Sequence, residues 1–229
     1  MIYAKDEKNN IVEANMAKKG RKYYCSGCHG QVILRCGKLR VSHFAHKKHA
    51  CDIFSEGETS EHLRGKKLLM TWLRKEGKDP QIEAYLTSLH QRPDILCNNK
   101  AFEFQCSPIS VERMSERSKG YISEGYDFFW FLGKRHLIKK RLTQQIAQFI
   151  RWHKNLGFYL IYINVEQRNM EVYYHIQQAD FLPVRFYRKK VNSWKELQDF
   201  FKQNRIKNYN LLSISERKRQ KNCFYRNCL

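Results

Sequence analysis

The chain has 229 residues, and its 43 Lys and Arg against 22 Asp and Glu give a formal net charge of +21. So many excess positive charges repel one another in a compact protein, and the sequence therefore predicts a polyanionic partner, with nucleic acid as the first choice. The alternative, a membrane surface, needs a basic amphipathic helix, a lipid anchor or a run of about 20 apolar residues, and we find none of these. The polar start over residues 1–10 is not typical of a signal peptide. We therefore expect a cytoplasmic protein whose eight cysteines include metal ligands rather than forming disulfides.

Composition and pattern divide the chain into three regions. Residues 1–54 contain four cysteines and four histidines, residues 55–165 carry regular apolar periodicity, and residues 166–229 are mixed and very basic. We expect a small metal-binding module, a central domain and a basic C-terminal region, in that order.

Helix-end signals and periodicity predict the regular elements. Ser60 is a suitable N-cap, Pro108 follows Ser107 as the first residue of a helix, and Ser193 with Glu196 forms a capping box. The predicted helices cover residues 60–77, 108–123, 142–150 and 194–201. The predicted strands cover residues 2–4, 11–14, 81–86, 91–97, 101–106, 126–132, 158–163 and 171–176.

The most informative stretch is a hairpin predicted to turn at Asn98-Asn99, because asparagine tolerates the left-handed conformations of a two-residue turn. With that turn, Asp94 lies directly opposite Glu103 on one face of the strand pair. Moving the turn by one residue places Asp94 opposite Gln105 instead. In both registers the three polar side chains share a face.

Two neighbouring carboxylates repel each other and destabilise a hairpin, but a bound divalent cation turns them into a site. Hard oxygen ligands suit Mg²⁺ or Mn²⁺, which can hold a phosphate and activate a water molecule. The alternative is a solvated strand face that is acidic by chance. Glu61, at the start of the preceding helix, either joins this cluster or only complements the helix dipole.

The order of these motifs resembles the PD-(D/E)xK nuclease superfamily, and more narrowly the competence protein CoiA family. The resemblance covers about residues 1–135 and rests on Glu61-His62 with Lys66, Arg92-Pro93-Asp94, residues 103–107, the aromatic strand ending at Gly133, and the Cys25-to-His46 segment. It implies an α/β restriction-endonuclease-like core, in which helices flank a mixed sheet. A small N-terminal zinc-binding β module and a basic C-terminal α+β extension would complete the chain. It also implies that the protein processes DNA for recombination during natural transformation, alongside the recombinase machinery.

The resemblance further implies that Asp94 and Glu103 bind the catalytic metal and that Glu61 supports it. Gln105 stands where the superfamily usually has lysine, and an amide can only orient water or phosphate by hydrogen bonding. Lys66 or Lys67, from the preceding helix, can supply the missing cation. We therefore expect metal-dependent hydrolysis of DNA phosphodiesters, with a non-catalytic DNA-binding adaptor of the same fold as the alternative and a zinc-dependent transcription factor as a weaker one.

Cys25 and Cys28 have the spacing of a zinc knuckle, and a hairpin turning at residues 37–38 would bring His46 beside them. Three of the four ligands of a closed, structural Zn²⁺ site are thereby predicted, and the fourth is either His43 or Cys51. We expect this site to serve folding or DNA docking.

The same turn would pair His46 with His29. It would leave Cys36 too far away to be a ligand, so Cys36 is expected to be a packing thiol. Cys223 and Cys228 have no histidine nearby and receive no role.

Basic residues alternate with aromatic ones over residues 185–190 and, more loosely, over residues 221–226. Arg and Lys hold phosphates while aromatic rings stack on bases, a combination suited to single-stranded or branched DNA. The alternative for each run is a solvated basic face. The predicted DNA contacts are Arg185, Arg188, Lys189 and Lys190, together with Arg113, Arg117 and Lys119 beside the acidic strand.

Overall fold

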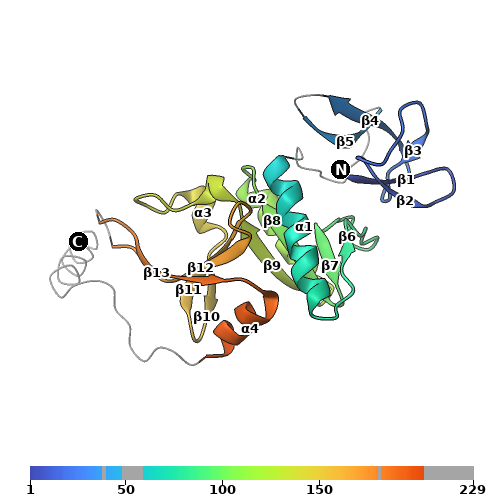
Figure 1. Ribbon diagram of the computed structural model, residues 1–229. Coiled ribbons are helices and arrows are strands. Elements are labelled where there is room, and N and C mark those ends of the chain that lie inside the picture. The colour runs from blue at the N-terminus through green and yellow to red at the C-terminus, as the bar shows by residue number, and fades with distance from the viewer. Residues whose placement is uncertain (38–39, 48–58, 180–181, 204–229) are drawn as a thin grey trace. The chain divides into compact units, whose positions relative to one another are not determined.

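The computed structural model describes residues 1–37, 40–47, 59–179 and 182–203 (Figure 1). Cys51, residues 221–226, Cys223 and Cys228 lie outside these ranges. The chain forms two compact units, one of residues 1–108 and 112–130, the other of residues 109–111 and 131–229. No helix in the described ranges is long and apolar enough to cross a membrane.

The first unit begins with an antiparallel sheet, blue in Figure 1, whose strand order is β2-β1-β3-β4-β5. A small apolar core that includes Tyr23, Val32 and Phe44 stabilises it. The strands predicted over residues 2–4 and 11–14 are confirmed to within one residue. The five strands are β1 (Tyr3–Lys5), β2 (Ile11–Glu13), β3 (Tyr23–Tyr24), β4 (Gln31–Gly37) and β5 (Arg40–His46).

The β4–β5 hairpin corrects two predictions. Gly37 is not in the turn but pairs with Arg40, and a bulge then shifts the register further, so that His46 lies opposite Val32 rather than His29. The predicted pairing was wrong because Gly37 belongs to the strand, which moves the register by two residues, and the bulge moves every later pair by one more. Cys36 is exposed, so the expectation of a packing thiol was also wrong.

The same unit contains the central helix and strand pattern. The helix predicted from Ser60 is confirmed, although its N-cap is Thr59, whose Oγ1 accepts a hydrogen bond from the N–H of His62 (3.1 Å). The strand order of this part is β9-β8-β7-β6, and β6, β7 and β8 are antiparallel. Its elements are α1 (Ser60–Lys75), β6 (Gln81–Ile82), β7 (Ile95–Cys97), β8 (Lys100–Gln105), α2 (Val111–Ser123) and β9 (Asp127–Leu132).

The hairpin at Asn98-Asn99 is confirmed, because Cys97 pairs with Lys100 and Asn98 has a left-handed φ of 53°. The two strands predicted before it are much shorter than expected. Glu83 adopts a positive φ, which interrupts the extended backbone and ends the first strand after Ile82.

Strand β8 is buried on both faces. A side chain at Gly65 of α1 would collide with the ring of Phe104, so α1 lies against the Phe104 face of the strand. Ala101 and Glu103 point the other way, toward Tyr121 of α2. Residues that alternate along β8 therefore face two different helices.

The second unit has the strand order β13-β12-β11-β9, in which the last two residues of β9 pair with β11 in parallel, and β10 pairs with the start of β11. The capping box is confirmed, since Oγ of Ser193 accepts from the N–H of Glu196 (3.0 Å). The helix predicted over residues 142–150 is reduced to one turn, α3 (Gln144–Ala147), and two strands were not predicted, β10 and β13. The remaining elements are η1 (Lys134–His136), β10 (Arg151–His153), β11 (Gly157–Asn164), β12 (Asn169–Gln177), β13 (Arg185–Val191) and α4 (Trp194–Lys202).

Candidate functional site

Asp94 lies directly before β7, and its carboxylate is held from two sides. Oδ2 accepts a hydrogen bond from the backbone N–H of Phe104 (2.8 Å) and lies 3.0 Å from Nε2 of His62 on α1. Oδ1 lies 3.7 Å from Nζ of Lys66, one helical turn further along α1. Burial alone would raise the pKa of Asp94, but His62, Lys66 and the hydrogen bonds together lower it well below its ordinary value. This carboxylate is therefore ionised at neutral pH.

Lys66 is fully buried, and it also pairs with a carboxylate that the sequence pattern did not reveal. Its Nζ donates to Oε1 of Glu83 at 2.7 Å, and the Glu83 side chain is only 5% exposed. The N–H of Glu83 donates to the carbonyl of Asp94 (3.0 Å), which links the two acids through the backbone as well. Helix α1 thus places one ammonium group between two acids.

Glu103 faces α2, where its Oε1 accepts hydrogen bonds from Nη2 of Arg117 and from the hydroxyl of Tyr121. The same Nη2 donates to the carbonyl of Arg92 (3.2 Å). Burial raises the pKa of Glu103; Arg117 opposes this shift, whereas the charge of Asp94 adds to it. Asp94 and Glu103 are therefore electrostatically coupled, although they are held by different helices.

The predicted register is confirmed, because Ile95 pairs with Phe102, and carried back by one residue this register sets Asp94 opposite Glu103. Strand β7 begins only at Ile95, however, and the Asp94 carboxylate contacts α1 whereas that of Glu103 contacts α2. Each carboxylate has its own cationic protein partner, so the hairpin does not depend on a metal to relieve repulsion. Among the described residues, Glu61, Asp94 and Glu103 do not form a group whose ligand oxygens all lie within 4.8 Å of one another. The catalytic metal site at these residues stays a prediction.

The other predicted catalytic residues lie around this network. Gln105 is buried, and its Nε2 donates to the carbonyl of Ser107 (2.7 Å). Glu61 is partly buried in the first turn of α1. Lys67, the alternative to Lys66, pairs instead with Glu13 of β2 at 2.9 Å. Lys66 is thus the lysine of α1 that reaches Asp94.

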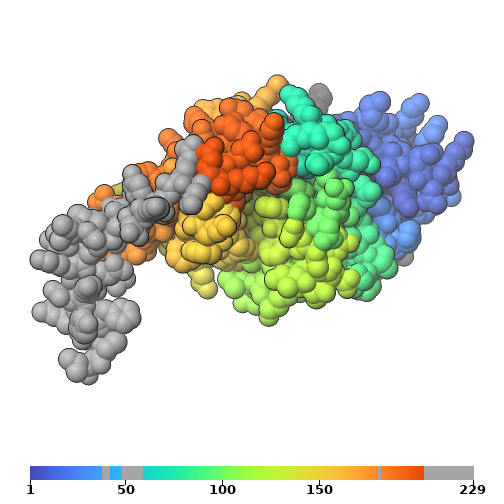
Figure 2. Space-filling model, turned by 90° about the horizontal axis from the view of Figure 1, so that it is seen from below, coloured from blue at the N-terminus to red at the C-terminus, as the bar shows by residue number. Residues whose placement is uncertain are grey.

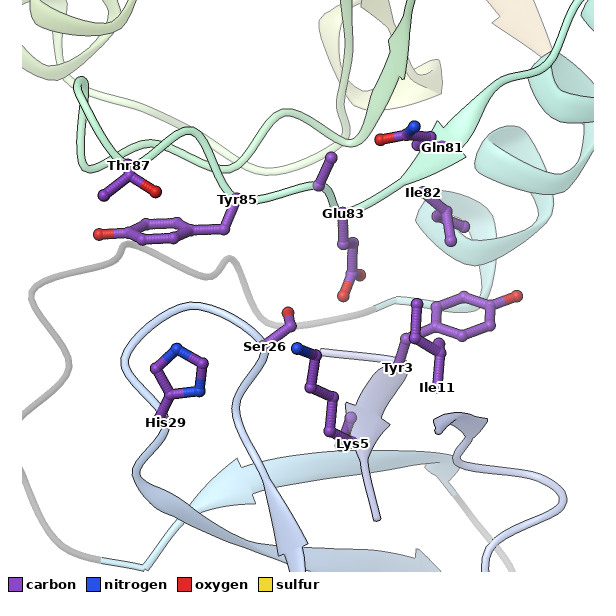
Figure 3. Close-up of a pocket in the computed structure, with 12 residues that line it drawn as sticks. Tyr3, Lys5, Ile11, Ser26, His29, Gln81, Ile82, Glu83, Tyr85 and Thr87 are labelled. Atoms are coloured by element: carbon purple, nitrogen blue, oxygen red, sulfur yellow. The ribbon is translucent and has the colours of Figure 1, made fainter. Parts of the chain in front are cut away.

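Glu83 also lines a cavity of about 490 Å³, shown in Figure 3. One wall includes β1 and the loop over residues 25–29, which contributes Ser26 and His29; the other consists of residues 81–85 and Thr87. In Figure 3 the carboxylate of Glu83 points into the space between these walls. The loop that carries the predicted zinc ligands and a residue bonded to Lys66 therefore meet at one cavity.

Cys25, Cys28 and His46 form a compact group of potential metal ligands, with all three ligand atoms within 4.8 Å of one another. The N–H groups of Gly27 and Gly30 each donate to a cysteine Sγ at 3.4 Å. Burial is the main cause that lowers the pKa of His46, and this favours the neutral imidazole that binds metals. Two thiols and one imidazole that converge in this way fit a borderline-soft ion such as Zn²⁺.

The two candidates for the fourth ligand have different outcomes. His43 lies three positions before His46 on β5, so strand alternation places it on the opposite face, and it is not part of the compact group. Cys51 lies outside the described residues. The structure thus brings together the three ligands that were predicted without an alternative.

The predicted DNA contacts on α2 lie in different environments. Arg113 pairs with Glu116 (3.1 Å), and Lys119 is exposed. Arg117 is buried against Glu103 instead of lining a groove. Arg117 therefore stabilises the carboxylate, whereas Lys119 lies where a phosphate can reach it.

Strand β13 distributes the other predicted contacts over both of its faces. Arg188 and Lys190 are exposed on one face, and Lys189 points to the other, where it lies 3.6 Å from Glu196. Arg185 is exposed at the start of the strand. Strand alternation thus divides a run of basic residues that is continuous in the sequence.

Sequence reasoning missed His62, Glu83 and Tyr121 as site residues. A signal existed for two of them: His62 precedes Lys66 by four positions, and Tyr121 follows Arg117 by four, so each pair lies on one helix face. Glu83 had no such signal, because it was expected within a regular strand.

Two family models match the chain: "Competence protein CoiA, N-terminal domain" over residues 6–54 and "Competence protein CoiA, nuclease-like domain" over residues 58–205. The Competence protein CoiA of Bacillus subtilis (strain 168) is 32% identical over 146 residues, which are 62% of this chain and 39% of that protein. The match thus spans less than half of the relative's length. No solved structure matches. Because the nuclease-like model alone covers more than half of the residues, the chain belongs to the competence protein CoiA family.

Proposed function

We propose that this chain is a divalent-metal-dependent nuclease of the PD-(D/E)xK type that hydrolyses DNA phosphodiesters. One observation carries the proposal: Nζ of Lys66 lies 3.7 Å from Oδ1 of Asp94, so α1 supplies the cation that the motif lacks at Gln105. The element order α1-β6-β7-β8-α2-β9 and the strand order β9-β8-β7-β6 are consistent with such a core.

The donor chemistry of Asp94 and Glu103 fits a hard cation, since both offer carboxylate oxygens. A Mg²⁺ or Mn²⁺ ion held by these two residues would supply an activated water and neutralise developing negative charge. Lys66, which is fully buried between Glu83 and Asp94, would act through Asp94 by keeping this carboxylate ionised and in place, and Gln105 would orient water or phosphate by hydrogen bonding. Glu61 would support the site from the first turn of α1.

We assign Cys25, Cys28 and His46 to a structural Zn²⁺ site whose fourth ligand is Cys51 or His43. Such a closed site leaves no open position for catalysis, so it would serve folding and DNA docking. Its loop forms part of the cavity at Glu83, which supports a role in shaping the substrate path.

The biological role follows from the family and the charge. A competence protein with a net charge of +21 is suited to handling DNA, and we propose that it processes DNA for recombination during natural transformation in the cytoplasm, alongside the recombinase machinery.

The test is cleavage of end-labelled single-stranded, duplex and branched DNA with Mg²⁺ or Mn²⁺. Asp94→Ala, Glu103→Ala and Lys66→Met are compared with Asp127→Ala, which removes a carboxylate that is 66% exposed and pairs with Lys100. Cleavage by the native chain and by Asp127→Ala, but not by the other three variants, is expected. Equal cleavage by Asp94→Ala and the native chain would refute the assignment.

A non-catalytic DNA-binding adaptor is the second candidate, and a specific observation favours it. Asp94 and Glu103 already have protein partners that satisfy their charges, from α1 and α2 respectively. Tight DNA binding without cleavage of any substrate under either metal would establish the adaptor and exclude the nuclease.

A further inference from the structure

Two aromatic side chains are exposed on the β10–β11 hairpin of the second unit. Trp152 on β10 lies directly opposite Phe158 on β11, and these residues are 65% and 54% exposed. The other three tryptophans of the chain, Trp72, Trp130 and Trp194, are only 4–6% exposed. In Figure 2 the yellow segment that includes β10 lies at the molecular surface. An exposed pair of large aromatic residues on a protein otherwise rich in charge marks a candidate binding surface.

Strand alternation places further aromatic residues on the same face of this sheet. Phe158 points to the same side as Leu160, which pairs with Tyr173 of β12. The ring of Tyr173 stacks on Phe186 of β13, with centroids 4.4 Å apart and an interplanar angle of 13°. The opposite face is covered by α4, whose Phe200 contacts Tyr174. The aromatic residues thus run across four strands on the face away from α4.

Basic side chains lie beside these rings. Arg188 pairs with Tyr173 across the strands, so it shares their face; it is 55% exposed and lies 3.6 Å from Glu171. Lys190, two positions further along β13, is exposed on the same face. Residues 131–203 contain fourteen Lys and Arg against five Asp and Glu. The face therefore combines stacking surfaces with positive charge.

We propose that the face formed by Trp152, Phe158, Phe186, Arg188 and Lys190 binds single-stranded DNA. Unpaired bases expose π-faces that can stack on aromatic side chains, while Arg and Lys hold the backbone phosphates; in a duplex the base faces are already stacked. This deepens the proposed function, because it names the form of DNA that the second unit holds, and it does not require Asp94 or Glu103 to cleave.

The alternative explanation is that Trp152 and Phe158 only stabilise the hairpin as a cross-strand pair. That reading accounts for their contact with each other. It does not account for the location of this large exposed aromatic pair on the same face of the sheet as Phe186, Arg188 and Lys190.

Because Trp152 is the one exposed tryptophan of four, its fluorescence reports on this face directly. Oligo(dT) added without divalent metal is expected to quench the emission and to protect the exposed fraction from acrylamide. A titration with duplex DNA accompanies it and is expected to act much more weakly, because the base faces of a duplex are already stacked. Unchanged emission and accessibility at saturating oligo(dT) would overturn the proposal. Equal protection by duplex DNA would also overturn it.

Variants separate stacking from a structural role. Trp152→Ala and Phe158→Ala are each expected to raise the Kd for labelled oligo(dT) about 5- to 150-fold, the change that corresponds to loss of one stacked base. Trp152→Phe should restore most of the affinity. Ile122→Ala, which truncates a residue 65% exposed on α2, is the matched control and should leave the Kd unchanged.

Unchanged Kd values in Trp152→Ala and Phe158→Ala would overturn the proposal. So would quenching that follows protein concentration instead of DNA, because the face would then bind a second copy of the chain. Asp94→Ala should bind oligo(dT) normally. If neither it nor the native chain cleaves DNA while Trp152 is still protected, the nuclease assignment fails and the binding face stands.

Discussion

Replacing Gly65 with alanine tests how α1 is seated on β8. In an isolated helix, alanine is about 1 kcal/mol more favourable than glycine, so helix propensity predicts a more stable protein. In the folded chain a Cβ at Gly65 would lie 1.9 Å from Cε1 of Phe104, far inside the contact distance of about 3.5–4.0 Å between carbon atoms. Helix propensity therefore predicts a higher free energy of unfolding for Gly65→Ala than for the native chain, whereas the contact with Phe104 predicts a lower one.

The magnitude follows from the burial of the ring. Phe104 is 1% exposed and its ring stacks against His62, so it has no solvent-filled space in which to move. Overpacking of a core costs about 1–3 kcal/mol, and a contact this short belongs at the upper end. After subtraction of the gain in helix propensity, we expect a loss of about 2 kcal/mol. For a chain of this size that corresponds to a decrease of about 4–8 °C in Tm.

The assay is thermal unfolding of Gly65→Ala, with Gly120→Ala of α2 as the matched control. A Cβ at Gly120 would meet Nε2 of Gln91, the end of a flexible side chain that can move aside, so its Tm should change by no more than about 2 °C. Adding Phe104→Leu to Gly65→Ala should recover part of the loss. A Tm of Gly65→Ala equal to or above that of the native chain would refute the proposed seating of α1.

Three further predictions concern charge, metal and pH. Lys66→Met leaves the acids Glu83 and Asp94 without their buried partner, so urea denaturation should show that the free energy of unfolding falls by about 3–5 kcal/mol. Adding Glu83→Gln should recover part of this loss. An unchanged urea midpoint contradicts the ion-pair network. Chelation should release about one equivalent of Zn²⁺ per chain and lower the Tm, and Cys28→Ser should lack this metal and have a similarly lowered Tm. Cys36→Ser should keep both the metal and the Tm of the native chain. A metal-free native chain would argue against the site. Burial, together with Glu13, raises the pKa of Tyr3 from its ordinary value of 10.0 to about 12, so its contribution to stability is complete below pH 10 and is lost as the pH rises through 12. Tyr3→Phe should therefore flatten the decline in stability over that interval, and an identical slope in both proteins contradicts the shift.

Several features could be predicted from short stretches of sequence because short-range preferences create them. The turn at Asn98-Asn99 follows from the tolerance of asparagine for positive φ, and the start of α4 follows from the capping box at Ser193. The convergence of Cys25 and Cys28 needs only a two-residue spacing. These signals act within a few positions, where backbone geometry alone decides the outcome.

The partners of the charged residues depended on tertiary packing. Asp94 meets His62 across 32 positions and Glu103 meets Arg117 across 14, and these contacts exist only because α1 and α2 dock on the strands of the hairpin. Likewise, the pairing of Gly37 with Arg40 and a bulge between β4 and β5 together decide which residue faces His46. A local pattern can place an acid on a strand. The cations of α1 that lower the pKa of Asp94 and the burial that raises the pKa of Glu103 arise only when distant elements pack around these residues.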